Sequence, residues 1–200
     1  MIIVGADNRP RCRWSEAAPE FVHYHDTEWG YPVNDDFKLF EKISLEGFQS
    51  GLSWRTILAK RENFREAFKN FDFNKIAAFK ENDVERLLGN PGIVRYRGKI
   101  EAVINNAQRA KEMVAKEGSL AAFFWRYEPK SNSAIEPQTA STSAESNALS
   151  KELKKRGWKF VGPTTVFAFM QAMGIINDHA IGCFYRNEVD KARKKFERPW

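Results

Sequence analysis

The sequence predicts an almost entirely helical protein, and three observations support this fold class. Strict alternation of apolar and polar residues, which is typical of a half-buried strand, is scarce along the 200 residues. Apolar residues instead recur at a spacing of three or four, which places them on one side of a helix. Glycine, proline and small polar residues divide these stretches where helix caps and stops are expected.

Amphipathic helices account for the first part of the chain. A helix capped by Asp35 or Asp36 is expected over residues 36–51, with Phe40 and Phe48 on its apolar side. Ser53 is a suitable N-cap for the helix that follows. Residues 64–71 continue the helical spacing with further phenylalanines. Each of these helices has one apolar side, so we expect them to pack around a common core.

A glycine-rich turn joins two predicted helices near the middle of the chain. The first helix is expected to begin at Asn82, in a capping box with Glu85. Residues 89–92, Gly-Asn-Pro-Gly, end it, because glycine accepts positive φ and proline cannot continue the hydrogen-bond ladder. Arg97 and Lys99 follow in the first turns of the second helix. Such a turn suits a phosphate, but the same residues also suit an ordinary turn with a solvated basic face.

The C-terminal half is also predicted to be mainly helical. Residues 128–147 are rich in Ser, Thr, Pro and Asn, which predicts a loop or an ordered irregular connection rather than a domain boundary. We therefore expect one domain over residues 1–200, with a charged tail at 188–200. One helix is expected from residue 100 up to Gly118, and Ser119 is expected to cap the next one, which continues to about Tyr127. Further helices are expected over 148–156 and from Pro163 to Met173.

The composition favours a globular protein with an anionic partner. Hydrophobic residues make up 42% of the chain, including 16 Phe and 6 Trp, and the formal net charge is +6. Apolar runs are too short to cross a membrane, and the N-terminus does not resemble a signal peptide. We therefore expect a cytoplasmic protein, in which the two cysteines stay reduced as buried thiols or metal ligands.

Two cysteines and two histidines offer a complete ligand set for zinc. Cys12 and His25 lie near one end of the sequence, and His179 and Cys183 near the other. Two thiolates and two imidazoles fill a tetrahedral site, and a site filled by protein ligands is structural rather than catalytic. Such a zinc would join the N-terminal segment to the C-terminal one. The same residues also suit buried thiols and satisfied core histidines, and their spacing does not decide between these alternatives.

Glu46, on the helix predicted over residues 36–51, has two interpretations. The first is a solvated helix glutamate, the common state of this residue type. The second places its carboxylate in a pocket of aromatic rings. Aromatic faces stack on a purine, and a carboxylate selects an exocyclic amine or a positively charged ring. The rings considered for this pocket belong to Trp14, Phe21, Tyr24 and Trp54.

Short sequence blocks from about residue 11 to residue 183 carry a family resemblance. They are RCRW at 11–14, YHDTEWG at 24–30, LEGFQSGLSW at 45–54, KRENF at 60–64, GIVR at 92–95, RGKI at 97–100, ALSK at 148–151, KKRG at 154–157, FVGPTT at 160–165, NDH at 177–179 and GC at 182–183. In this order and without large gaps, they resemble the DNA-3-methyladenine glycosylase I family, within the helix-hairpin-helix glycosylase superfamily.

The resemblance implies an all-α helix-hairpin-helix glycosylase fold with one structural zinc per chain. Phe21 stands where some relatives carry a tyrosine, so one polar contact of the pocket is missing here. The wider superfamily usually carries a catalytic aspartate after the hairpin, and both this family and this sequence lack it. The family's zinc ligands fall on Cys12, His25, His179 and Cys183, and its base-pocket residues fall on Trp14, Tyr24, Glu46 and Trp54.

The activity implied is base-excision repair by a monofunctional, monomeric enzyme. It hydrolyses the N-glycosidic bond of 3-methyladenine in double-stranded alkylated DNA, after the base has flipped into the pocket that contains Glu46. Glu46 either binds the base or also activates water. Leu52 is expected to wedge into the emptied base stack. Backbone contacts to DNA are expected from Gly92, Val94, Arg97 and Lys99.

Two other functions are compatible with parts of the sequence. A non-enzymatic, zinc-clasped DNA-binding module accounts for the charge, the hairpin and the metal ligands, but gives Glu46 no role. A protein-interaction domain would bind its partner without the steep salt dependence of phosphate contacts.

Overall fold

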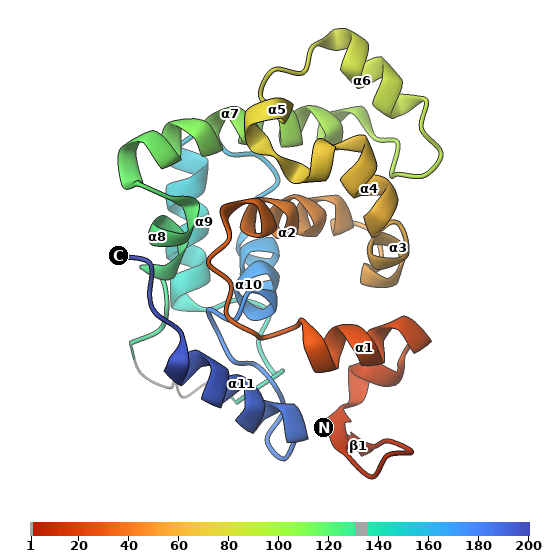
Figure 1. Ribbon diagram of the computed structural model, residues 1–200, viewed down its shortest axis with the longest axis vertical. Coiled ribbons are helices and arrows are strands. Elements are labelled where there is room, and N and C mark those ends of the chain that lie inside the picture. The colour runs from red at the N-terminus through yellow and green to blue at the C-terminus, as the bar shows by residue number, and fades with distance from the viewer. Residues whose placement is uncertain (1, 131–135) are drawn as a thin grey trace.

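The structure is a computed structural model that describes residues 2–130 and 136–200, and helices form most of it (Figure 1). This confirms the helical fold class. The sequence did not predict one small element, a two-stranded antiparallel sheet of β1 (Ile2–Val4) and β2 (Pro10–Cys12). Within the described ranges, no helix combines the length and apolarity needed to cross a membrane.

The N-terminal half folds into short helices around one longer helix, α2. Asp35 and Ser53 cap α2 and α3 as predicted, since their side chains accept the N–H groups of Lys38 and Thr56. The helices are α1 (Pro19–Thr27), α2 (Asp36–Gln49), α3 (Trp54–Ala59), α4 (Arg61–Ala67), α5 (Phe73–Ile76) and α6 (Glu81–Leu88), with 3₁₀ turns η1 (Arg13–Glu16) and η2 (Lys69–Phe71).

Two boundaries in this half differ from the prediction. Helix α2 ends at Gln49, because Gly51 takes a φ of +78° and turns the chain before α3. Helix α6 begins at Glu81 rather than Asn82, and the carboxylate of Asp83 accepts the N–H of Lys80. The predicted capping box of Asn82 with Glu85 is therefore wrong, since the whole cap lies earlier in the chain.

The C-terminal half contributes longer helices. At the start of α9, the side-chain oxygens of Ser143 and Ser146 each accept the backbone N–H of the other residue. Because of this cap, the helix begins before residue 148, where it was predicted to start. Much of the tail expected at 188–200 is helical, and its Val189 is buried. The helices are α7 (Arg97–Glu117), α8 (Leu120–Trp125), α9 (Ala144–Lys155), α10 (Pro163–Ala172) and α11 (Phe184–Lys195).

Helix α2 runs through the middle of the fold and contacts α7, α8 and α10 (Figure 1). Its residues from Leu39 to Phe48 are buried, except for the partly exposed Glu41. Two of the buried residues, Lys42 and Glu46, are ionisable. Buried charged groups need partners, which makes this part of α2 a candidate for function.

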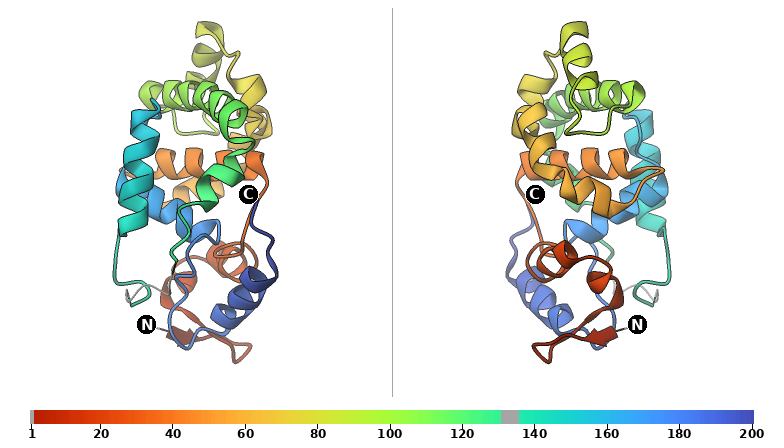
Figure 2. Two further views of the ribbon diagram at one scale, coloured as in Figure 1. Left: turned by 90° about the vertical axis from the view of Figure 1, so that its left-hand side faces the viewer. Right: turned by 90° about the vertical axis from the view of Figure 1, so that its right-hand side faces the viewer.

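A smaller apolar cluster connects the two ends of the chain. Helix α11 contacts β2, and both lie beside α1 at one end of the molecule (Figure 2). The buried residues of this cluster include Cys12, Tyr24, Trp29 and Cys183. The N-terminal and C-terminal segments are thus packed directly against each other.

Candidate functional site

Glu46 lies in the interior of the protein with only 6% of its surface exposed. It lies in the second half of α2, which is packed against α3, α7, α8 and α10. Its carboxylate Oε1 lies 2.9 Å from the Nζ atom of Lys42, one helical turn earlier. Glu46 is therefore not the solvated helix glutamate that the sequence allowed.

The four aromatic residues considered for a pocket form a continuous series of ring contacts. The ring centroids of Trp14 and Phe21 are 5.9 Å apart, and those of Trp14 and Tyr24 are 6.3 Å apart. Tyr24 and Trp54 follow at 5.5 Å. The indole Nε1 of Trp54 is buried and has no hydrogen-bond partner among the described residues. An unpaired buried donor is available to a ligand.

Lys42 connects these aromatic rings to the carboxylate. Its ammonium donates to the Tyr24 hydroxyl at 2.6 Å and lies 3.5 Å from the centroid of the Trp54 ring. Burial lowers the pKa of Lys42, and the nearby charge of Glu46 opposes that shift. Burial also raises the pKa of Tyr24 well above its usual value, with the negative charge of Glu46 acting in the same direction.

Lys42 was not predicted as a site residue. The signal for it was its spacing of four from Glu46, which places both side chains on one side of a helix. Charged pairs at this spacing are common on solvated helix faces, so the spacing gave no reason to place Lys42 in the interior.

A cavity of about 380 Å³ adjoins this site between α1, α2, α4 and the end of α10. Tyr24, Lys42 and Trp54 line this cavity and also belong to the group of residues around Glu46. Two ion pairs also line it: Arg61 contacts Glu28 at 2.6 Å, and Arg65 contacts Glu41 at 2.8 Å.

Three of the four predicted metal ligands come together at the junction of the chain ends. One ligand atom from each of Cys12, His25 and Cys183 lies within 4.8 Å of the others, and all three residues are buried. The Sγ atom of Cys183 is 3.7 Å from His25 Nε2. The backbone N–H of Ala180 donates to Cys12 Sγ at 3.3 Å. This cluster is a possible metal site.

His179 lies beside this cluster, with its ring centroid 4.8 Å from that of His25. Its Nε2 atom is buried without a hydrogen-bond partner among the described residues, while its Nδ1 lies 3.2 Å from Asn177 Oδ1. Burial lowers the pKa of His179 to about 4, so the ring is neutral near pH 7. The Nδ1 atom of His25 is likewise held, 2.8 Å from Asp26 Oδ1. Both rings thus keep Nε2 for a ligand, as metal-binding histidines do.

The residues predicted to contact DNA lie in different environments. Leu52 is 43% exposed in the turn between α2 and α3, and Val94 is half-buried in the turn before α7. Arg97 forms ion pairs with three glutamates of α6 and α7. Lys99 is buried, and its ammonium donates to the carbonyl groups of Phe48 and Ser50 at the end of α2.

Gly92 lies in a turn that is held from both sides. Its N–H donates to Asn90 Oδ1 at 2.8 Å. Its carbonyl accepts from Lys60 Nζ and Asn63 Nδ2, which connects the turn to α4. A Cβ atom at position 92 would lie 3.0 Å from both asparagine side chains, so a larger residue does not fit without a shift.

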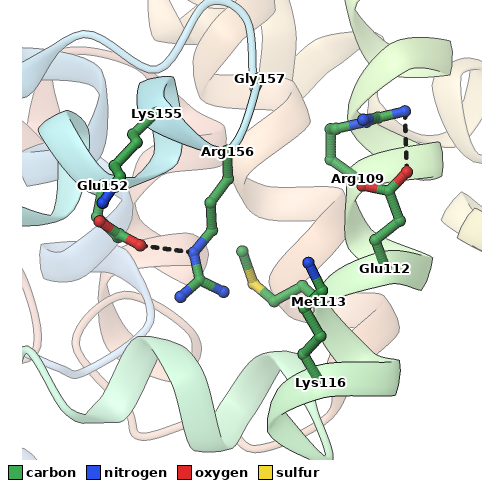
Figure 3. A pocket seen from close by; sticks show the side chains of 8 residues that line it. All are labelled: Arg109, Glu112, Met113, Lys116, Glu152, Lys155, Arg156 and Gly157. Atoms are coloured by element: carbon green, nitrogen blue, oxygen red, sulfur yellow. Dashed lines mark hydrogen bonds and ion pairs between the residues drawn. The ribbon is translucent and has the colours of Figure 1, made fainter.

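A second hollow, of about 480 Å³, lies between α7 and α9 and is lined mainly by charged side chains (Figure 3). Arg156 pairs with Glu152 at 2.7 Å, and Arg109 pairs with Glu112 at 3.0 Å. Each of these two guanidinium groups thus has a carboxylate partner, although the Nε atom of Arg109 is buried without a hydrogen-bond partner among the described residues.

Comparison with known proteins finds relatives that span most of this chain. A family model described as methyladenine glycosylase matches residues 14–186. The "DNA-3-methyladenine glycosylase 1" of Escherichia coli (strain K12) is 50% identical over 178 residues, which cover 86% of this chain and 95% of that protein. A crystal structure of 3-methyladenine DNA glycosylase I matches with a TM-score of 0.81 at 49% identity, over 87% of this chain and 98% of that one.

A second solved structure is a tyrosine-to-phenylalanine variant of 3-methyladenine DNA glycosylase I in complex with 3-methyladenine. It matches with a TM-score of 0.82 at 36% identity, over 88% of this chain and 97% of that one. The family model and the relatives each span most of the sequence, and they agree with one another. The chain belongs to the methyladenine glycosylase family.

Proposed function

We propose that this protein removes 3-methyladenine from alkylated double-stranded DNA by hydrolysing its N-glycosidic bond, as a monomeric, monofunctional base-excision repair enzyme. The observation that carries the proposal is the buried carboxylate of Glu46, which the ammonium of Lys42 connects to the hydroxyl of Tyr24 and the ring face of Trp54. The names of the relatives and the 3-methyladenine bound in one of them point to the same substrate.

The chemistry of the substrate explains why such a pocket is sufficient. Methylation at N3 makes the adenine of a nucleotide cationic, so the base is already a good leaving group and needs little protonation. A flipped base stacks on Tyr24, Trp14 and Trp54, whose faces attract a cation. Glu46 accepts hydrogen bonds from the base, and its negative charge favours the cationic form over undamaged adenine. The same negative charge also stabilises positive charge that develops on the sugar.

The helix-hairpin-helix element is proposed to consist of α6, α7 and the turn between them. The DNA is proposed to lie across this turn and the C-terminal end of α2. The N-terminus of α7 carries no side-chain cap hydrogen bond, and with Gly92 and Val94 it suits a backbone phosphate. Leu52 is exposed at the end of α2 and suits a wedge in the emptied stack. Arg97 adds positive charge, whereas Lys99 acts by holding α2 against α7.

A structural zinc ion is proposed at Cys12, His25, His179 and Cys183. Two buried imidazoles and two buried thiols are a suitable donor set for it, and the Nε2 atom of His179 has no hydrogen-bond partner among the described residues. All four coordination positions would come from protein, so the ion supplies no catalytic step. It would hold β2 and α1 to the segment that precedes α11.

The proposal is tested by incubating the protein with methylated duplex DNA and measuring the released bases chromatographically. We expect free 3-methyladenine to appear in a time-dependent manner. A protein that binds the DNA with a steep salt dependence but releases no base would instead be a non-enzymatic DNA-binding module.

A further inference from the structure

The pocket assigned to the base already holds a cation. The ammonium of Lys42 contacts the carboxylate of Glu46 at 2.9 Å and the hydroxyl of Tyr24 at 2.6 Å. It also lies 3.5 Å from the centroid of the Trp54 ring, and Lys42 is only 5% exposed. A flipped cationic purine would be attracted by the same three features: a carboxylate, a ring face and a hydroxyl group.

We propose that Lys42 is an intramolecular occupant of the base pocket, which a flipped base has to displace before it can bind. The inference rests on the proposed function. An ammonium 3.5 Å from the centre of the Trp54 ring occupies the stacking distance on that face, so a base cannot stack there at the same time. Two cations at one buried carboxylate also repel each other.

The adjoining cavity provides a place for the displaced side chain. Lys42 already lines this cavity of about 380 Å³, and its four-carbon stem is flexible. Glu28 and Glu41 line the same cavity, where they pair with Arg61 and Arg65. Displacement therefore moves the ammonium into a cavity that contains two ion pairs, where it joins their carboxylates, and not into an apolar part of the core.

Because of Lys42, the affinity of a purine for the pocket depends on whether the purine carries a positive charge. An undamaged purine that enters the pocket separates Lys42 from Glu46 and leaves the buried carboxylate without a cation. A purine that carries a positive charge replaces the ammonium with a new cation. Glu46 thus provides the preference for a charged base, and Lys42 raises the affinity that any base needs before the pocket accepts it.

The experiment measures the binding of free 3-methyladenine and follows the Lys42 ammonium by NMR in ¹⁵N-labelled protein. We expect Lys42→Met to bind 3-methyladenine about tenfold more tightly, or better, because the base then does not have to break the contacts of an ammonium with Glu46, Tyr24 and Trp54. The matched control is Lys38→Met, one turn earlier on α2, whose exposed side chain lines the same cavity. Its affinity should equal that of the unsubstituted protein.

In the unsubstituted protein, saturation with 3-methyladenine should move the Lys42 ammonium signal and speed its exchange with water. This measurement does not depend on how well Lys42→Met folds, because the signal can be assigned through its bonds. An unchanged, protected Lys42 signal at saturation would overturn the inference. Weaker binding by a folded Lys42→Met would also overturn it, since Lys42 would then help to hold the base.

The two proposals fail in different ways. If the unsubstituted protein neither releases 3-methyladenine from methylated DNA nor binds the free base, the proposed function is wrong. If it does both while the Lys42 signal stays unchanged, the proposed function stands and only the displacement of Lys42 is wrong.

Discussion

The Nε2 atom of His25 lies 3.7 Å from the Sγ atom of Cys183, although 158 positions separate these residues in the sequence. Their contact connects α1 to the start of α11 at the junction of the two chain ends. Because residues so far apart meet only in the folded chain, a metal held there stabilises the folded state over the unfolded one.

The first prediction concerns the thiolate of Cys183. We expect Cys183→Ala to lower the zinc content from about one ion per chain to near zero. It should also lower Tm by about 6 °C or more, since each 1 kcal/mol lost from the free energy of unfolding lowers Tm by roughly 2–4 °C in a chain of this size. Elemental analysis and thermal melting measure both effects. His23→Ala is the control, because His23 is exposed on the same helix as His25. A variant that keeps its stability but loses activity contradicts a structural metal.

The second prediction concerns Asp26, which holds the Nδ1 atom of His25 at 2.8 Å. Asp26→Asn should weaken zinc binding by about 10- to 100-fold, because the imidazole loses its orientation and part of its basicity. Competition with a chromogenic chelator measures the affinity. Equal zinc affinity in the variant and the unsubstituted protein would show that Asp26 serves Arg11 alone, which it also contacts at 2.8 Å.

The third prediction concerns the carboxylate of Glu46. Glu46→Gln should reduce the release of 3-methyladenine by about 100-fold or more, since a neutral amide no longer stabilises the cationic base or the positive charge on the sugar. Circular dichroism should show an unchanged helix content. Glu66→Gln, at an exposed position of α4, should keep full activity. Near-normal release by Glu46→Gln would argue against the proposed mechanism.

The fourth prediction concerns Leu52. Leu52→Ala should reduce excision from duplex DNA by about tenfold while leaving the affinity for free 3-methyladenine unchanged, because the wedge acts only on a stacked base. The excision rate and the free-base affinity are measured side by side. Equal losses in both would indicate that Leu52 supports the pocket itself rather than the extrusion of the base.

The fifth prediction tests whether Lys99 connects two helices or binds a phosphate of the DNA. The slope of log K against log salt changes by about 0.9 for each lost phosphate contact. Lys99→Met should leave this slope unchanged, because its ammonium is used by the carbonyls of Phe48 and Ser50. Its excision rate should still fall, since α2 loses its connection to α7. A shallower slope would assign Lys99 to the DNA backbone instead.

Residue spacing and capping predicted most helices of the fold. Phe40 and Phe48 are buried on α2, and Asp35, Ser53 and Ser119 cap helices as expected. The sheet of β1 and β2 was not predicted, because three-residue strands are too short for an alternating pattern to be recognised.

The environment of the charged residues was harder to predict. A lysine in the sequence suggests a solvated or phosphate-binding group, yet Lys42 and Lys99 are both buried with specific partners. These partners come from helices that meet only in three dimensions, and one sequence contains no record of such contacts. The same holds for the gathering of Cys12, His25 and Cys183, for which the residue types suggested a metal but not their proximity.

The bond from Lys99 to the end of α2 has a mechanical consequence. Helix α7, whose first turn faces the proposed phosphate, and helix α2, which carries Glu46, are joined by this side chain at the carbonyl groups of Phe48 and Ser50. If α7 binds a phosphate and Glu46 binds the base, as proposed, the fold sets the distance between these two groups. A base whose backbone phosphate lies outside that distance would then not reach the carboxylate.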